Sequence, residues 1–109
     1  MELPGGNRGN KYHARKTEVD GEQFPSRREA RRWAELRLLE AHGKISGLYR
    51  QVPFRMEVNG HPICVYRADF VYHENGHRVV EDCKGVRTRE YVIKKKLLFA
   101  TTGIEIRET

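Results

Sequence analysis

The sequence feature that most constrains the fold is the dipeptide Asn75-Gly76, which lies between two β-prone segments. Both central positions of a type I′ turn need a positive φ, which Asn and Gly tolerate, so the dipeptide predicts a two-residue hairpin loop. A turn centred there fixes the register of both strands and puts Asp69 directly opposite Asp82. Directly opposed side chains have Cβ atoms about 4.5 to 5.5 Å apart, and like charges so placed repel. The register therefore predicts that a cation lies between the two aspartates.

Alternation along the strands assigns the neighbouring side chains to two faces. Lys84 joins Asp69 and Asp82 on one face, whereas Glu81 and Cys83 point to the other. A one-residue slip would exchange Glu81 with Asp82 but would also turn Lys84 away, which favours Asp82 as the site residue. Two interpretations remain: a metal site, or a cross-strand salt bridge between Asp69 and Lys84. The salt bridge leaves the opposed Asp82 unexplained.

Two segments predict helices, from about residue 26 to 42 and from about 88 to 102. Ser26 and Glu29 match the S-x-x-E capping box at the start of the first segment, and a glycine follows each segment as a stop signal. Apolar residues recur at helical spacing in the first segment and predict its buried face: Ala30, Trp33, Ala34, Leu38 and Ala41. We assign Trp33 and Phe70 to core packing.

Strands are predicted before, between and after these helices. Asp20-Gly21 suggests a minor hairpin ahead of the first helix, Asn59-Gly60 turns one strand into the next, and Pro53 suggests a bent or edge strand. The order αβββαβ predicts an α/β (α+β) domain with a mixed central sheet flanked by helices. The main strands are expected at about 45 to 58, 63 to 73, 78 to 84 and 104 to 108.

Charge and length limit the class of function. Within the 109 residues we expect one small domain over 16 to 109. A basic arm at 1 to 15 precedes it and is either a disordered end or a DNA-binding segment, in which Arg15 and the adjoining Lys16 would contact DNA. With 21 Lys and Arg against 15 Asp and Glu, the net charge of +6 favours a polyanionic partner such as nucleic acid, although a merely basic soluble protein shows the same balance.

Cysteine content and hydropathy indicate the cellular compartment of the protein. Cys64 and Cys83 are the only cysteines, and the predicted register keeps them far apart along the strands, so we expect a reduced, intracellular protein without a disulfide. No apolar run approaches the roughly 20 residues of a membrane span, and the N-terminus lacks the apolar centre of a signal peptide. A cytoplasmic protein with no membrane partner is expected.

The arrangement of acids and lysine resembles the PD-(D/E)XK superfamily of restriction-endonuclease-like nucleases. The element order, Asp69 on one strand, "EDCK" on the next and Glu29 in the first helix all fit that pattern. Asp82 and Lys84 stand at the acid and lysine positions, with Cys83 as the spacer. Ala68 replaces the proline of the family name, at a position that varies in such enzymes.

The resemblance is closest to small phage-encoded proteins that look like relatives of the archaeal Holliday junction resolvases. Those proteins read "NKYHA", "F-x-S-x-x-E-A", "ADF" and "EDxKG", and this chain has "NKYHA", "FPSRREA", "ADF" and "EDCKG". The resemblance covers residues 10 to 109, which is nearly the whole chain.

Phosphodiester hydrolysis explains why carboxylates and a lysine would meet. Mg²⁺, for which Mn²⁺ can substitute, prefers oxygen ligands and supplies an activated water, so Asp69 and Asp82 would anchor it. Lys84 would hold or deprotonate the attacking water and stabilise negative charge. The resemblance implies that the Cys83 backbone carbonyl is a third ligand and that Glu29 contacts the metal or its water. Glu29 is also explained by the capping box alone, and one or two metals are both possible.

Other residues are candidate DNA contacts. Gln51 resembles a family position near the active site, although an ordinary amide at a strand end is equally consistent. Tyr91, Lys94 and Lys95 lie at i, i+3 and i+4 of the second helix and share a side, where they would contact phosphate or simply form a solvated surface.

These expectations converge on a Mg²⁺-dependent, structure-selective DNA endonuclease, a Holliday junction resolvase that makes paired symmetric nicks as a homodimer. One alternative is another nuclease of the same fold, a nickase or flap endonuclease in phage replication or packaging. The other is a non-catalytic basic DNA-binding module, which the set of Asp69, Asp82 and Lys84 disfavours.

Overall fold

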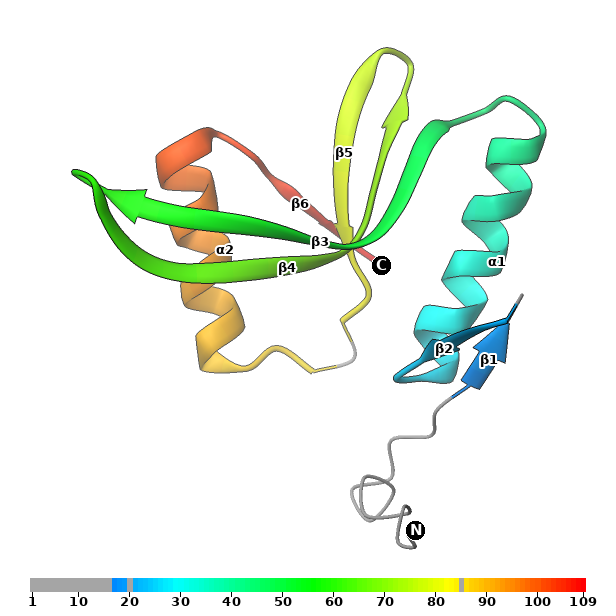
Figure 1. The fold of residues 1–109 in the computed structure, drawn as a ribbon, viewed down its shortest axis with the longest axis horizontal. Helices are drawn as coiled ribbons and strands as arrows, with labels where there is room; N and C mark the ends of the chain where they lie inside the picture. Colours follow the sequence, from blue (N-terminus) through cyan, green and yellow to red (C-terminus); the bar gives the residue numbers. More distant parts are fainter. Residues whose placement is uncertain (1–16, 20, 85) are drawn as a thin grey trace, which may run out of the picture. The chain divides into compact units, whose positions relative to one another are not determined.

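The hairpin that Asn75-Gly76 predicts is present in the computed structural model, where β4 (His61–Glu74) pairs antiparallel with β5 (His77–Asp82) (Figure 1). The two turn residues both have positive φ, as a type I′ turn requires. Pairing follows the predicted register up to Phe70 opposite Glu81. The predicted register is therefore confirmed for the pairs from Glu74–His77 to Phe70–Glu81.

The structure describes residues 17–19, 21–84 and 86–109, and the order of the elements within them matches the predicted order. The predicted arm at 1 to 15, with Arg15, and the adjoining Lys16 lie outside the described residues. Besides β4 and β5, the elements are β1 (Thr17–Val19), β2 (Glu22–Phe24), α1 (Arg27–Ala41), β3 (Ser46–Val58), α2 (Arg89–Thr102) and β6 (Ile106–Glu108).

The main sheet has four strands in the order β3-β4-β5-β6. The first three are antiparallel neighbours, whereas β6 runs parallel to β5. The chain passes through α2 between β5 and β6. The α+β class and the mixed sheet are thus confirmed. β3 lies at an edge of the sheet, where the missing N–H of Pro53 is tolerated. β1 and β2 form a separate antiparallel pair within the described residues.

The chain divides within α1 into two units, Met1–Glu35 and Leu36–Thr109. In the first unit the rings of Phe24 and Trp33 pack with centroids 6.0 Å apart. The Ser26 hydroxyl accepts the Glu29 backbone N–H at 3.2 Å, so the N-terminal cap that the sequence predicts is formed.

The buried face of α1 differs from the prediction. Ala30, Trp33 and Leu36 are buried, whereas Leu38 is 62% exposed. The buried residues are spaced three apart along the helix. The predicted face instead continued from Trp33 to Ala34 and Leu38, which lie on a neighbouring part of the helix surface. Apolar spacing allowed both stripes, and tertiary packing selects between them.

In the second unit, α2 packs on β3 and β4. The Thr88 hydroxyl caps the helix by accepting the Tyr91 N–H at 3.1 Å, and Gly103 ends it in the left-handed region with φ 79°. The buried core of this unit comprises Met56, Tyr66, Ala68, Val71, Val80, Tyr91, Leu98 and Ile106.

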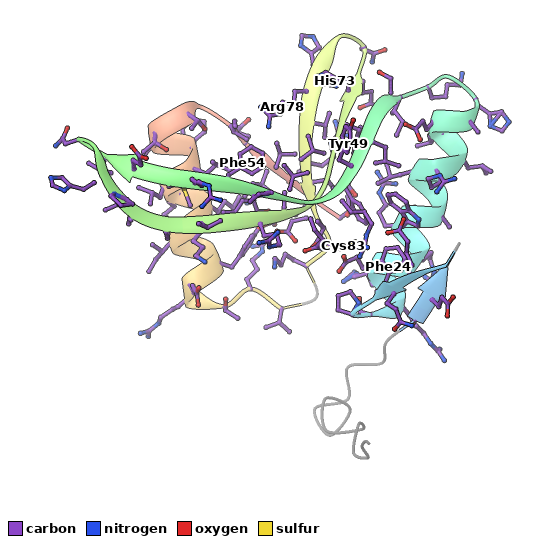
Figure 2. The ribbon with its side chains drawn as sticks, in the orientation of Figure 1. Phe24, Tyr49, Phe54, His73, Arg78 and Cys83 are labelled. Atoms are coloured by element: carbon purple, nitrogen blue, oxygen red, sulfur yellow. The ribbon has the colours of Figure 1, made fainter. Side chains whose placement is uncertain are left out.

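β3 and β4 bend sharply about halfway along their length, as Figure 1 shows. Ala68 and Val71 both belong to the same core cluster although they are three residues apart, so the alternation of faces shifts between them. In the opposite strand, Gln51 has φ 52°. Arg78 of β5 lies 5.0 Å above the Phe54 ring of β3, which is not its neighbour in the sheet (Figure 2). The bend brings these strands together.

The cysteines and the apolar character of the helices were also subjects of expectation. Among the described residues, no disulfide joins Cys64 and Cys83. No helix in the described part of the chain has the length and apolar character needed to cross a membrane.

Candidate functional site

The candidate site lies on one row that crosses all four strands of the main sheet at the bend. Gln51 of β3 lies between residues that pair with Phe70 and Ala68 of β4, and the hairpin register, continued by one pair beyond Phe70–Glu81, puts Asp69 opposite Asp82 of β5. Asp82 in turn pairs with Glu108 of the parallel strand β6. Three carboxylates therefore follow one another across neighbouring strands, at the position where regular alternation breaks.

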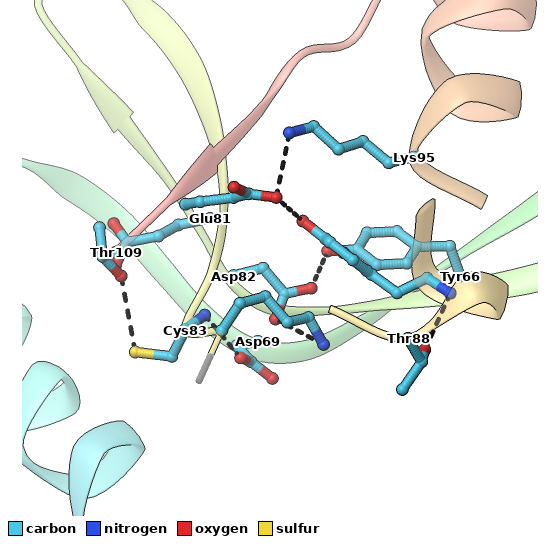
Figure 3. A network of polar contacts seen from close by, with 11 residues as sticks. Tyr66, Asp69, Glu81, Asp82, Cys83, Thr88, Lys95 and Thr109 are labelled. Atoms are coloured by element: carbon cyan, nitrogen blue, oxygen red, sulfur yellow. Dashed lines mark hydrogen bonds and ion pairs between the residues drawn. The ribbon is translucent and has the colours of Figure 1, made fainter. Parts of the chain in front are cut away.

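The two predicted aspartates are held by different partners (Figure 3). Asp69 is partly buried, and its Oδ2 accepts the Cys83 backbone N–H at 2.9 Å. Asp82 is only 2% exposed, and its Oδ2 accepts the Tyr66 hydroxyl. Burial, followed by the hydrogen bond to Asp82, raises the pKa of Tyr66 far above its ordinary value. Tyr66 therefore stays protonated and acts as the donor.

A cation stands beside these carboxylates. The Lys84 ammonium lies 3.5 Å from Asp82 Oδ1 and 4.3 Å above the centre of the Tyr91 ring. The Lys84 side chain remains 27% exposed, so the ammonium keeps access to solvent. The electron-rich ring face attracts a cation, and the contact fixes the lysine next to Asp82.

Glu81 and Cys83 occupy the other face of the sheet, as predicted. Glu81 is fully buried; its Oε1 accepts the Tyr72 hydroxyl at 2.5 Å and its Oε2 accepts the Thr109 hydroxyl at 3.0 Å. The Cys83 sulfur lies 3.5 Å from the same Thr109 hydroxyl. Arg107 of β6 donates to the Tyr72 hydroxyl oxygen at 3.1 Å.

Glu108, at the end of the row, has basic and hydroxyl partners. Its Oε2 accepts the Tyr91 hydroxyl at 2.7 Å and lies 3.0 Å from the Lys95 ammonium, while Arg87 contacts Oε1. The hydrogen bonds from Tyr91 and Lys95 lower the pKa of Glu108 to about 2. The pKa of Tyr91 is raised, first by burial and then by its hydrogen bond to this carboxylate.

The remaining predicted residues lie in different surroundings. Lys94 forms an ion pair of 2.9 Å with Glu90 one turn earlier in α2, and Lys95 is engaged with Glu108. Gln51 accepts a hydrogen bond from Arg67 through its backbone carbonyl at 3.2 Å. Glu29 belongs to the first unit of the chain, and its contact with the site stays a prediction.

The donor set can be compared with the needs of a metal ion. Within 17–19, 21–84 and 86–109, no three His, Cys, Asp or Glu side chains are grouped so as to hold a metal. Asp69 and Asp82 supply a pair of carboxylates at one row, with the Cys83 peptide next to Asp69. Mg²⁺ suits a small set of this kind, because it keeps several of its waters.

Residues 9 to 109 match the family described as "Protein of unknown function (DUF1064)". The chain belongs to this family. No curated protein matches the chain, and no solved structure does so either. The family description names no activity.

Two residues of the site were missed by the sequence analysis. Strict alternation puts Tyr66 on the opposite face from Asp69, and only the shift at the bend directs it toward Asp82. Glu108 joins the row through the parallel pairing of β6 with β5, which no turn signal specifies. The acidic "IEIRE" ending was the one available hint.

Proposed function

We propose that this protein is a Mg²⁺-dependent, structure-selective DNA endonuclease with a restriction-endonuclease-like core, and specifically a phage-type Holliday junction resolvase. The observation that carries the proposal is the meeting of Asp69, Asp82 and Lys84 at one end of the β4–β5 hairpin. Hydrolysis of a phosphodiester needs ligands for a hard cation and a positive group beside the attacking water. These three side chains are of the types that supply both.

The metal-binding part of the proposal uses oxygen donors alone. Asp69 and Asp82 would hold Mg²⁺, with the Cys83 carbonyl as a third ligand and Glu29 contacting the metal or one of its waters. When bound, Mg²⁺ lowers the pKa of a coordinated water and polarises the scissile phosphate. Mn²⁺ would substitute because it accepts the same oxygen ligands.

The protein side chains have separate tasks in this scheme. Tyr66 donates to Oδ2 of Asp82 and so fixes the orientation of that carboxylate. Lys84 lies beside Oδ1, where its ammonium would orient or deprotonate the attacking water and stabilise the negative charge that develops on the phosphate. The Tyr91 ring limits the positions that the lysine can take.

Symmetry and charge specify the proposed substrate and assembly. A four-way junction contains two equivalent strands, and a homodimer with two-fold symmetry presents one site to each of them. The net charge of +6 favours association with DNA. The protein would act in the cytoplasm, which is the host cytoplasm if the protein is phage-encoded.

A supercoiled plasmid that extrudes a cruciform tests the proposal. A dimeric resolvase nicks both strands within one bound lifetime, so linear plasmid should form directly in Mg²⁺. Heterodimers that pair one normal subunit with one Asp82→Asn subunit should give mostly nicked circles. If the wild-type protein sediments as a monomer and yields only nicked circles, it is a nickase rather than a resolvase. No cleavage of any branched or linear DNA would overturn the nuclease itself.

A further inference from the structure

A surface pocket of about 410 Å³ opens directly beside the candidate site, between the first turns of α2 and the middle of β4. Tyr66 and Lys84, which contact the two oxygens of Asp82, both line this pocket. These two side chains therefore connect the pocket with Asp82. Figure 3 shows two of the lining residues, Tyr66 and Thr88, together with Asp82.

Among the described residues, three basic ones and one acidic one line the pocket. Arg67 comes from β4, Lys84 from the segment after β5, and Lys94 from α2, while Glu90 is the acidic residue of the lining. Glu90 is exposed and pairs with Lys94 at 2.9 Å. Its pKa is lowered by the hydrogen bond from Lys94 and by the charge of that lysine. At neutral pH the lining thus carries an excess of positive charge.

A second pocket of the same volume lies between α2 and β6 and differs in character. Lys95 and Lys96 line it together with apolar residues that include Phe99. Lys95 there is engaged with Glu108. The two pockets thus divide the lysines of "KKK": Lys94 lines the pocket beside the carboxylates, and Lys95 and Lys96 line the other.

We propose that the pocket beside Asp82 binds the DNA phosphate that neighbours the scissile one, through Lys94 and Arg67, with Glu90 as a competitor for Lys94. This inference rests on the proposed function, because it identifies how the strand runs past the same site. A guanidinium and an ammonium that line one pocket from two elements suit a phosphate group. Lys84 lines both the pocket and the candidate site, so one strand can occupy the two together.

Binding measurements with single-charge variants test the assignment. The full chain is titrated into a fluorescent four-way junction, and separately into linear duplex, with EDTA present so that no strand is cut. We expect Lys94→Gln and Arg67→Gln each to weaken binding about fivefold or more and to reduce the salt slope by about one. Glu90→Gln should strengthen binding severalfold, because Lys94 loses its competing partner.

Lys96→Gln is the matched control, since it removes the same charge from the same helix but faces the other pocket. It should change affinity by less than about twofold, which is the contribution of a distant charge at moderate salt. Equal effects of Lys94→Gln and Lys96→Gln would overturn the assignment, as would a Glu90→Gln variant that binds no better than the wild type. Thermal melts confirm that each variant is folded.

Cleavage by the wild-type protein in Mg²⁺ is recorded separately. If the DNA is cut but Lys94 and Lys96 behave alike, the pocket assignment fails and the nuclease proposal stands. If the DNA is bound with the predicted order of variants but never cut, the nuclease proposal fails and the pocket remains a phosphate site.

Discussion

Asp82 and Glu81 are adjacent on β5 and almost equally buried, yet they lie in contrasting surroundings on the two faces of the sheet. Asp82 has an ammonium 3.5 Å away, and that lysine keeps access to solvent. Glu81 is held by the hydroxyls of Tyr72 and Thr109. Both acids accept a tyrosine hydroxyl, but the second oxygen of Asp82 lies beside the partly exposed Lys84 ammonium and that of Glu81 accepts the Thr109 hydroxyl.

The contrast indicates which carboxylate is suited to chemistry. A buried carboxylate whose acceptors are filled by hydroxyl donors has a structural role, because its removal leaves those donors without a partner. A carboxylate next to a second acid and a partly exposed lysine can exchange partners with a metal, a water or a phosphate.

The largest effect is expected from the aspartates. Asp69→Asn or Asp82→Asn should lower DNA cleavage by at least about 100-fold, because each removes charge needed at the reacting phosphate. DNA affinity should stay within about twofold, since most of it comes from the basic surface. Glu81→Gln is the matched control on the other face and should cut at close to the wild-type rate. Cleavage and binding assays on labelled junctions measure both quantities.

The two aspartate variants also test whether the carboxylates stabilise the fold. Without metal, Asp69→Asn and Asp82→Asn should keep or raise the melting temperature, because two carboxylates on one row repel and Lys84 can be solvated after the change. A clear drop for both variants would indicate that the aspartates serve the fold through a salt bridge rather than a metal.

The next largest effect is a loss of stability when Glu81 is replaced. Glu81→Leu should lower the free energy of unfolding by about 2 kcal/mol, because the buried Tyr72 hydroxyl and the Thr109 hydroxyl lose their acceptor. Urea denaturation followed by circular dichroism measures this change. An unaltered denaturation midpoint would show that the hydroxyl contacts contribute little and that the two faces differ less than the contacts suggest.

A pair of tyrosine variants separates positioning from folding. Tyr66→Phe removes the donor to Asp82 and should slow cleavage about tenfold, with a stability loss of about 1 kcal/mol. Tyr72→Phe removes the donor to Glu81, with a similar loss of stability and unchanged cleavage. Equal effects of both variants on cleavage would show that the loss follows stability rather than the orientation of Asp82.

The smallest effect concerns Glu108 and pH. Its pKa in the folded protein is about 2, below the ordinary value of about 4.3, so its contacts stabilise the fold fully above that ordinary value. The stabilisation is lost as pH falls from about 4.5 toward 2. The melting temperature of the wild type should exceed that of Glu108→Gln by about 3 °C at pH 7 and converge with it near pH 2. A difference independent of pH would exclude the charged contacts as its cause.

Much of the fold followed from local signals in the sequence. Asn75-Gly76 fixed the β4–β5 register because a two-residue loop leaves little freedom in pairing. The caps at Ser26, Thr88 and Gly103 delimit the helices because orphan backbone groups at helix ends need partners. The juxtaposition of Asp69 and Asp82 is a consequence of these local rules.

The rest depends on tertiary structure that spacing does not encode. The bend beside Gln51 shifts the alternation and brings Tyr66 to Asp82, against the strict two-residue period. The parallel addition of β6 brings Glu108 to the row through a crossover rather than a tight turn. For the same reason, the sequence grouped Lys94 with Lys95, whereas the fold directs them to different acidic partners.

The most direct test of the central claim is cleavage of a labelled four-way junction by the wild-type protein, with Mg²⁺ in one reaction and EDTA in the other. Flap and linear duplex substrates run beside it report the preference for structure. We expect cleavage in Mg²⁺, none in EDTA, and a faster reaction on the junction than on linear duplex. Intact junctions in Mg²⁺ at protein concentrations that saturate binding, or equal cleavage in EDTA, would contradict it.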